Sequence, residues 1–393
     1  MEKENKRIKI EKQGVLLLRG HITKKNNKWY FVVDIGKIDG KRKQKWSKGY
    51  DKKKLAEEAL AEFIQQFNAG EYIDNKGITV AEYLNKWFHD YVEIKLAPRT
   101  QIRYLEIINN YFIPEFGRIK LSDLKPYHLQ SHYSKVIEKL SASTVLYHHR
   151  VIHKALKQAV KWQFISHNPA DNVEPPSANK SDFTVLSAEH IDKLIQYLKE
   201  QNHILYIPVL LAVMTGMRRG EICGLQWPDI DFNTGTLQIK RQLQRINGEL
   251  VLRETKTAGS RRPISLDDIT ISLLKEYRQE QKKNRVLFGP EYHVENFGFV
   301  CTWPDGKLLD PDYISHVFPR LLKELNLPPV RFHDLRHTSA TMLLEAGVNP
   351  KVVSERLGHT DIRITLNTYS HVLPNMQKEA AEKLAEKLFS KSR

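Results

Sequence analysis

The sequence predicts a multidomain α+β protein. We expect a small N-terminal three-stranded β-sheet with one helix, an all-helical middle domain, and a mainly helical C-terminal domain with a small antiparallel sheet. Three observations predict this order. The length of 393 residues suits two or three domains. The apolar pattern changes from strand-like to helix-like along the chain. A stretch rich in Pro, Asn, Ser and Asp at residues 167–182 has the composition of a linker.

Composition indicates a protein of a reducing cytosol. The 41% hydrophobic and 27% charged content is typical of soluble globular proteins. No run of about 18 apolar residues predicts a membrane span, and the charged start lacks the apolar core of a secretion signal. Two cysteines, Cys223 and Cys301, cannot form a disulfide framework.

The charge is uneven along the chain. Its 62 Lys and Arg residues and 46 Asp and Glu residues give a formal net charge of +16. Residues 1–54 carry 18 basic and 6 acidic side chains, a net charge of +12. Such a basic concentration is typical of a nucleic-acid-binding surface. A solvated, solubilising terminus is the alternative.

Residues 1–74 form the first predicted domain. The aromatic and β-branched run at 28–36 predicts a strand, the Asp39-Gly40 pair predicts a hairpin turn, and 15–22 is a plausible earlier strand. A helix should begin after Asp51 and end at Gly70. Its apolar positions recur every four residues at Leu55, Ala59, Phe63 and Phe67.

Residues 77–168 form the all-helical second domain. Thr79 and Glu82 have the spacing of a capping box. A later helix at 140–165 places four basic residues on one face, namely Arg150, Lys154, Lys157 and Lys161. That face could follow a phosphate backbone, or it could be an exposed lysine-rich surface without a ligand. Residues 169–182 are the predicted linker.

Residues 183–393 form the third domain. Ser187 should cap a helix, and an apolar helix should end at the Thr215-Gly216 turn. Three short antiparallel strands are predicted at 236–244, 248–256 and 261–266, and helices again after about 310.

Several polar residues of this domain stand in apolar surroundings, and each has a structural alternative. Arg218 could form an ordinary salt bridge with Glu221, Lys256 could be a solvated lysine at a hairpin tip, and His359 could be a loop histidine. Tyr369 could be a packing residue, since a phenol with a pKa near 10 is a poor nucleophile at neutral pH.

Two histidines flank Arg336. His333 and Arg336 are three positions apart, so one helical face carries both. His333 and His337 are four apart, a spacing that could bind zinc. The zinc-protease pattern needs Glu after the first histidine, however, and Asp334 stands there with no third ligand marked. We therefore predict no metal site.

The order of these segments carries the strongest functional signal. "TGMRRGE", "TKT…S.R.I.L", "H.LRH", "LGH" and "TY" follow one another, with 23 positions from Arg336 to His359 and ten from His359 to Tyr369. The chain resembles the tyrosine site-specific recombinases, and within them the integrases of temperate phages and integrative conjugative elements. The resemblance implies a basic arm-type DNA-binding domain at 1–74, a SAM-like core-binding domain at 77–168 and a catalytic domain at 183–393.

The resemblance also implies roles for individual residues. Tyr369 would attack the scissile phosphorus and form a 3′-phosphotyrosyl link. Arg218 and Arg336 would bind the non-bridging oxygens, where negative charge develops in the transition state. Glu221 would orient Arg218 or its neighbours. No metal, nucleotide or other cofactor is implied.

The resemblance implies proton-transfer and supporting roles for the remaining site residues. His333 would accept the phenol proton, Lys256 would protonate the departing 5′ oxygen, and His359 would donate a hydrogen bond to a non-bridging oxygen. Ser260 and Arg262 match the motif of the family's hairpin and would support it or contact phosphate.

The resemblance implies partners as well. Double-stranded DNA would be bound at core and arm sites by a homotetramer, with an excisionase and a host DNA-bending protein as further partners, in the bacterial cytoplasm at the nucleoid. An amphipathic tail helix would dock on a neighbouring protomer, although it could pack on its own domain. Its apolar positions are Met376, Ala380, Leu384 and Leu388.

Two other functions would fit part of the pattern. A type IB topoisomerase shares the reaction, but it needs neither a second DNA-binding domain nor a docking tail. A DNA-binding regulator without catalysis would not need the complete Arg, Lys, His, Arg, His, Tyr set. The sequence therefore predicts a site-specific integrase.

Overall fold

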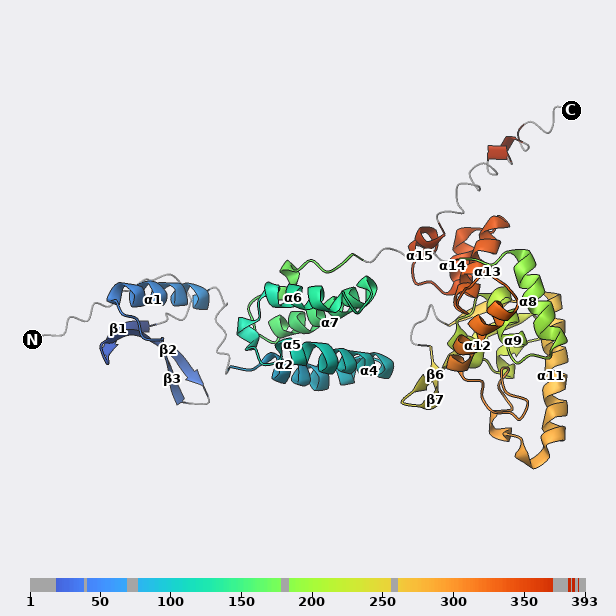
Figure 1. Ribbon diagram of the computed structural model, residues 1–393, viewed down its shortest axis with the longest axis horizontal. Coiled ribbons are helices and arrows are strands. Elements are labelled where there is room, and N and C mark those ends of the chain that lie inside the picture. The colour runs from blue at the N-terminus through green and yellow to red at the C-terminus, as the bar shows by residue number, and fades with distance from the viewer. Residues whose placement is uncertain are drawn as a thin grey trace, which may run out of the picture. The chain divides into compact units, whose positions relative to one another are not determined.

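The structure is a computed structural model that describes residues 19–38, 41–68, 77–177, 184–255 and 261–369, with separate helical positions between 381 and 388. The chain divides into two compact units, residues 1–180 and 181–393. The division falls inside the predicted linker. Figure 1 shows the elements of each unit.

The first unit begins with a three-stranded antiparallel sheet and one helix. The strands β1 (Arg19–Lys25), β2 (Lys28–Ile38) and β3 (Lys41–Trp46) pair in that order. Helix α1 (Lys53–Asn68) packs on the sheet through Phe63, which lies 5.3 Å from Phe31 between ring centroids. The predicted sheet and helix are confirmed. Asp39, Gly40 and Gly70 lie outside the described residues.

The rest of the first unit is helical. α2 (Val80–Trp87) continues through a π-helical turn, Phe88–Val92, into α3 (Glu93–Lys95). α4 (Pro98–Ile107) continues through Ile108–Phe112 into α5 (Ile113–Phe116). The remaining elements are α6 (Pro126–Val136), α7 (Ala142–Lys161) and short 3₁₀ turns at Leu121–Asp123 and Pro169–Asn172.

The capping box predicted for this part of the chain forms. The Thr79 side chain and the Glu82 carboxylate make the reciprocal capping box at the start of α2. Buried Tyr83 donates a 2.5 Å hydrogen bond to the Ala155 carbonyl and so ties α2 to α7. This contact joins the two helices that frame the core of the domain.

The second unit is mainly helical. α9 (Tyr206–Thr215) is buried over most of its surface and lies beside α8 (Ala188–Glu200) and α13 (Asp334–Glu345). The other helices are α10 (Arg219–Cys223), α11 (Asp268–Phe288), α12 (Pro311–Glu324), α14 (Pro350–Leu357) and α15 (Ile362–Thr368). Ser187 caps α8 as predicted.

The strands of this unit correct the sequence prediction. A three-stranded sheet contains β4 (Ile230–Asp231), β5 (Thr236–Ile239) and β8 (Arg262–Ser265), and β6 (Arg241–Ile246) with β7 (Glu249–Glu254) makes a separate hairpin. The single strand predicted at 236–244 is therefore wrong, because the chain leaves one sheet at Lys240 and enters the other.

A buried carboxylate accounts for that break. Asp229 is 3% exposed, and its oxygens lie 3.1 Å from Lys240 Nζ and 2.7 Å from Arg241 Nη1. Burying a carboxylate is costly unless it is paired. The chain therefore turns so that both consecutive cations reach Asp229.

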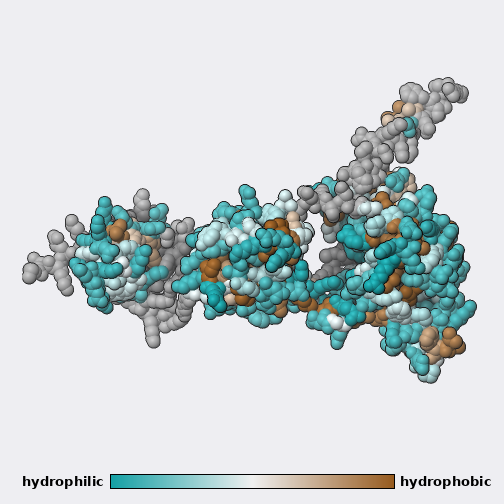
Figure 2. Space-filling view, in the orientation of Figure 1, coloured by the Kyte–Doolittle hydropathy of each residue, from teal (hydrophilic) through white to brown (hydrophobic). Residues whose placement is uncertain are grey.

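The surface is mostly hydrophilic on the face shown in Figure 2. An apolar exception lies at the end of α11, where Val286 and Leu287 are 82% and 80% exposed. No helix in the described part of the chain has the length and apolar character that a membrane span requires.

Candidate active site

Two glycines end helices at the centre of the second unit. Gly216 ends α9 with φ 66°, and Gly358 ends α14 with φ 69°. This left-handed conformation is disfavoured for residues with a Cβ. A Cβ on Gly216 would also lie 2.5 Å from Cδ2 of Leu357. The two helix ends can therefore approach only because position 216 has no side chain.

The carbonyl oxygens of these helix ends hold two arginines. Arg336, 3% exposed, donates from Nη1 to the Gly216 oxygen and from Nη2 to the Leu357 oxygen, both at 2.7 Å. Arg218 lies at the start of α10 and donates from Nη2 to the Gly358 oxygen at 3.4 Å. Backbone carbonyl oxygens at the two helix ends that the glycines terminate thus hold both guanidiniums in place.

Glu221 contacts Arg218 and a second arginine. Its carboxylate accepts hydrogen bonds from the Arg218 backbone N–H at 2.9 Å and from Arg218 Nη1 at 2.8 Å. Arg262 Nη2 donates at 3.1 Å to the same Oε2 atom that accepts the Arg218 backbone N–H. Burial alone would raise the pKa of Glu221, but the Arg262 and Arg218 guanidiniums outweigh it and lower that pKa. Glu221 is therefore a buried anion.

Arg262 is a buried partner of Glu221. Its side chain is 5% exposed, and it donates from Nε to the Arg356 carbonyl at 2.6 Å as well as to Glu221. These contacts fit the support role expected for Arg262, and its phosphate contact stays a prediction.

His333 and His359 border the arginines. His359 follows Gly358, and its Nδ1 lies 2.7 Å from Oγ1 of Thr365. Burial, with Arg336 and Arg218 nearby, lowers the pKa of His359 to about 4. His333 is exposed at the start of α13, and desolvation, with His337 and Arg336 beside it, lowers its pKa to about 4. Both imidazoles are neutral at pH 7.

Tyr369 completes the cluster from the end of α15. The side chain is 1% exposed and packs against Leu344, Val353 and Leu357 of α13 and α14. Burial raises the pKa of Tyr369 to about 12, although Arg336 acts in the opposite direction. Its hydroxyl lies 2.8 Å from Nδ1 of His337. Tyr369 is therefore a packing residue, as the sequence allows, and this packing is compatible with a chemical role.

The cluster is strongly cationic. Burial first, and then the neighbouring Arg218 and Arg262, lower the pKa of the Arg336 guanidinium, which still stays protonated at neutral pH. Two cations held together by backbone carbonyls form a preorganised site for an oxyanion. The arrangement suits the non-bridging oxygens of a phosphodiester.

Comparisons with known proteins identify the family. Residues 184–376 match the phage integrase family, residues 21–67 an arm DNA-binding domain, and residues 79–137 the N-terminal SAM-like domain of phage integrases. A tyrosine recombinase XerC-like protein of Caldanaerobacter subterraneus subsp. tengcongensis is 30% identical over 382 residues, which cover 92% of this chain and 97% of that protein. The chain belongs to the phage integrase family of tyrosine recombinases. It is an enzyme that cleaves and rejoins DNA, and nothing in these comparisons supports the topoisomerase alternative.

The recombinase shares its fold with solved integrases. The integrase of transposon Tn1549, in complex with a circular intermediate DNA, gives a TM-score of 0.68 at 22% identity, over 78% of this chain and 100% of that one. A lambda integrase tetramer bound to a Holliday junction gives a TM-score of 0.56 at 17% identity, over 87% and 92% of the two chains. The predicted fold class is confirmed.

Some predicted site residues remain untested. Lys256 and Ser260 lie outside the described residues of the recombinase. The hairpin expected to carry Lys256 between the second and third predicted strands does not form, because β7 pairs with β6 and β8 pairs with β5. The connection from β7 to β8, in which residue 256 falls, joins the two sheets.

The basic face of α7 forms as predicted. Arg150, Lys157 and Lys161 are exposed, and Lys154 is half-buried, with Nζ 5.8 Å from the ring centroids of Tyr91 and Tyr104. Ile152, Leu156 and Ala159, predicted to face a core, are fully buried in it. The face is available to a ligand, but its DNA contacts remain a proposal.

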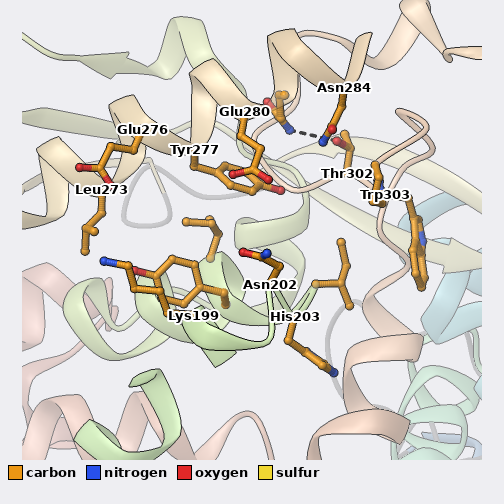
Figure 3. A pocket seen from close by; sticks show the side chains of 15 residues that line it. Lys199, Asn202, His203, Leu273, Glu276, Tyr277, Glu280, Asn284, Thr302 and Trp303 are labelled. Carbon is orange, nitrogen blue, oxygen red and sulfur yellow. Dashed lines mark hydrogen bonds between the residues drawn. The ribbon is translucent and has the colours of Figure 1, made fainter. Parts of the chain in front are cut away.

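The recombinase also has a pocket apart from the cluster. It is bordered by the α8–α9 junction, by α11 and by residues 302–304, and Glu276 and Lys199 line it (Figure 3). Tyr206 lines it at the start of α9, whereas Gly216 ends the same helix about 15 Å away at 1.5 Å per residue. None of the candidate catalytic residues that the structure describes borders the pocket.

Sequence reasoning misses the role of one residue in the site and of one residue outside it. The sequence marks His337 only as a possible zinc ligand, yet it contacts Tyr369. The available signal is its place four positions after His333, since a helix carries such residues on one face. Asp229 gives no signal, because its partners follow only from the break at Lys240. Among the described residues, no three His, Cys, Asp or Glu side chains are grouped to hold a metal ion.

Proposed function

We propose that the chain is the site-specific integrase of a mobile element and that Tyr369 is its nucleophile. One observation carries the proposal. The Tyr369 hydroxyl is held in the same chain that supplies Arg218 and Arg336, close enough for the Arg336 charge to act on the phenol. One protomer would therefore provide both the nucleophile and the phosphate-binding cations.

The chemistry follows from this arrangement. The Tyr369 oxygen attacks the scissile phosphorus, forms a 3′-phosphotyrosyl bond and releases the 5′ oxygen. Negative charge grows on the non-bridging oxygens and is stabilised by Arg218 and Arg336, with a hydrogen bond from His359. Rejoining reverses these steps with the 5′ hydroxyl of another strand, so no cofactor is consumed.

Proton transfers complete each step. Lys256 donates a proton to the departing 5′ oxygen, and the connection from β7 to β8 delivers it. His333 is exposed at the start of α13 and neutral at pH 7, and it accepts the phenol proton that Tyr369 loses as its oxygen attacks the phosphorus. Ser260 supports the same connection.

Two further surfaces bind DNA in this proposal. The basic face of α7 contacts the phosphates of the core site. The N-terminal sheet with helix α1 binds arm sites. Lys24 of β1 and Lys53 of α1 both lie within 6.0 Å of the Trp29 ring centroid. Deleting residues 1–74 should leave core-site cleavage intact and reduce integration between full sites at least tenfold. Normal integration by this deletion would rule out the arm-binding role.

Assembly is the last part of the proposal. Four protomers would exchange strands between two duplexes through a Holliday junction, in the bacterial cytoplasm at the nucleoid, with an excisionase and a DNA-bending protein setting direction. Its support is the similarity to the lambda tetramer. Leu384 and Leu388, 58% and 62% exposed, suit a tail that docks on a neighbouring protomer. Met376 and Ala380 of that tail lie outside the described residues.

The decisive assay supplies two duplexes carrying the element's attachment sites. A four-way junction should accumulate, followed by recombinant product. Relaxation of supercoiled DNA without any junction would indicate a topoisomerase-like enzyme instead. DNA binding without either product would indicate a regulator.

A further inference from the structure

The nucleophilic tyrosine has a polar partner that the proposed mechanism does not use. The Tyr369 hydroxyl and Nδ1 of His337 are 2.8 Å apart, a normal hydrogen-bond distance. The two ring centroids are 5.8 Å apart at 54°, so the rings meet at an angle and do not stack. The contact is directed through a single nitrogen.

Helix α13 links this contact to the phosphate-binding cation. Arg336 and His337 are consecutive residues of α13. The Arg336 guanidinium is fixed by the carbonyl oxygens of Gly216 and Leu357. Any partner of His337 is therefore held at a set position relative to Arg336.

Packing of the Tyr369 ring does not by itself fix the direction of its hydroxyl group. The Tyr369 ring lies among aliphatic side chains of α13 and α14, which hold it in the core. Aliphatic contacts have no directional preference for a phenol oxygen. The hydrogen bond to His337 supplies that direction.

The two histidines of α13 are differently placed. His333 is exposed, whereas His337 is half-buried and lies against Tyr369. Their ring centroids are 5.5 Å apart and the rings are nearly perpendicular. His333 thus borders the surface that the DNA approaches, and His337 lies beneath it at the nucleophile.

We propose that His337 is a positioning residue that holds the Tyr369 hydroxyl in line for attack on the phosphorus. This inference rests on the proposed role of Tyr369 as nucleophile. Before the attack, the hydroxyl donates its hydrogen to Nδ1 of the neutral imidazole, which leaves an oxygen lone pair directed by the bond and fixed relative to Arg336. The proton passes to His333 only as the oxygen bonds to phosphorus. Burial keeps His337 neutral by lowering its pKa.

The geometry allows a test by side-chain shape. The Oδ1 atom of asparagine is as many bonds from Cα as Nδ1 of histidine, whereas Oε1 of glutamine matches Nε2. His337→Asn can therefore accept the same hydrogen bond, and His337→Gln cannot reach the same point. His337→Phe keeps the ring and removes the acceptor.

The experiment measures single-turnover cleavage of a nicked suicide substrate by the full chain at saturating protein, with DNA affinity and melting temperature measured for each variant. Misplacement of a nucleophile by about 1 Å costs on the order of 100-fold in rate. We expect His337→Phe and His337→Gln to cleave roughly 30- to 100-fold more slowly, in line with that cost. His337→Asn should stay within about fivefold of wild type, and DNA affinity should not change.

Four outcomes are informative. Wild-type rates for His337→Phe would overturn the inference, and so would His337→Asn cleaving as slowly as His337→Gln at equal stability. Failure of the underlying function would look different, since the wild-type chain itself would then form no covalent adduct. An adduct in wild type that Tyr369→Phe abolishes keeps the proposed function whatever His337 does.

Discussion

The carbonyl oxygen of Gly216 accepts a 2.7 Å hydrogen bond from Nη1 of Arg336. A helix end, formed in the left-handed conformation, thereby fixes a cation that has been removed from water. Because α9 and α14 both contribute acceptors, the position of the guanidinium depends on how these two helix ends pack. Changes to that packing should therefore affect catalysis as well as stability.

Gly216→Ala tests this dependence. The alanine would have to keep the backbone φ of 66°, and its Cβ would lie 2.5 Å from Cδ2 of Leu357. Backbone strain and a steric clash therefore add together. We expect a loss of roughly 2–4 kcal/mol in stability and more than tenfold in cleavage rate. Gly248→Ala is the matched control, since Gly248 has φ 86° but open space around it. Equal losses in the two variants would show that backbone strain alone matters.

Glu221→Gln should show what the buried anion contributes. The substitution removes the charged partner of Arg262, which is 5% exposed. Removing one member of a buried ion pair costs roughly 3–5 kcal/mol, and Arg218 should lose its orientation. Thermal melting and single-turnover cleavage measure the two effects. Glu295→Gln changes an exposed carboxylate that contacts His293 and should change neither by much.

The basic face of α7 predicts a salt-dependent effect on DNA affinity. Lys157 and Lys161 are exposed on it. Removing one lysine that binds a phosphate should reduce the slope of log affinity against log salt by about 0.9, so Lys157→Ala with Lys161→Ala should reduce it by roughly 2. Lys135→Ala on α6 should leave the slope unchanged. An unchanged slope in the double variant would remove α7 from the DNA interface.

The helical part of the first unit should lose stability in acid. His148 is 1% exposed, and desolvation lowers its pKa to about 4, below the ordinary value of 6.5. The unfolded chain binds this proton first as pH falls. The stabilisation is therefore complete above about pH 6.5 and declines toward pH 4, by up to about 1.4 kcal/mol per pH unit.

Hydrogen exchange in α7 between pH 7 and pH 5 measures this decline. His148→Leu should flatten the pH dependence, even if it changes stability at pH 7. His89→Gln is the control, because that imidazole is 67% exposed. A slope equal to that of wild type in His148→Leu would show that another group titrates.

Much of this molecule is predictable because its signals are local. The capping box at Thr79, the apolar helix ending at Gly216 and the basic face of α7 depend on residues within a few turns of each other. The motif spacing also identifies Arg218, Arg336 and Tyr369 as one set.

The rest depends on contacts between distant segments. The break at Lys240 follows from a carboxylate eleven positions earlier, at Asp229. The burial of Arg262 depends on Glu221, 41 positions away. The contact of His337 with Tyr369 joins residues 32 positions apart. No local pattern of polarity specifies such pairs, because each is decided by how helices pack in three dimensions.

The central claim is that Tyr369 becomes covalently bound to DNA. The direct measurement is to trap the protein on a nicked suicide substrate, digest the adduct and identify by mass spectrometry the residue that carries the nucleotide. We predict a single modified peptide with the nucleotide on Tyr369, and no adduct from Tyr369→Phe. A nucleotide on any other residue, or an undiminished adduct from Tyr369→Phe, would contradict the account.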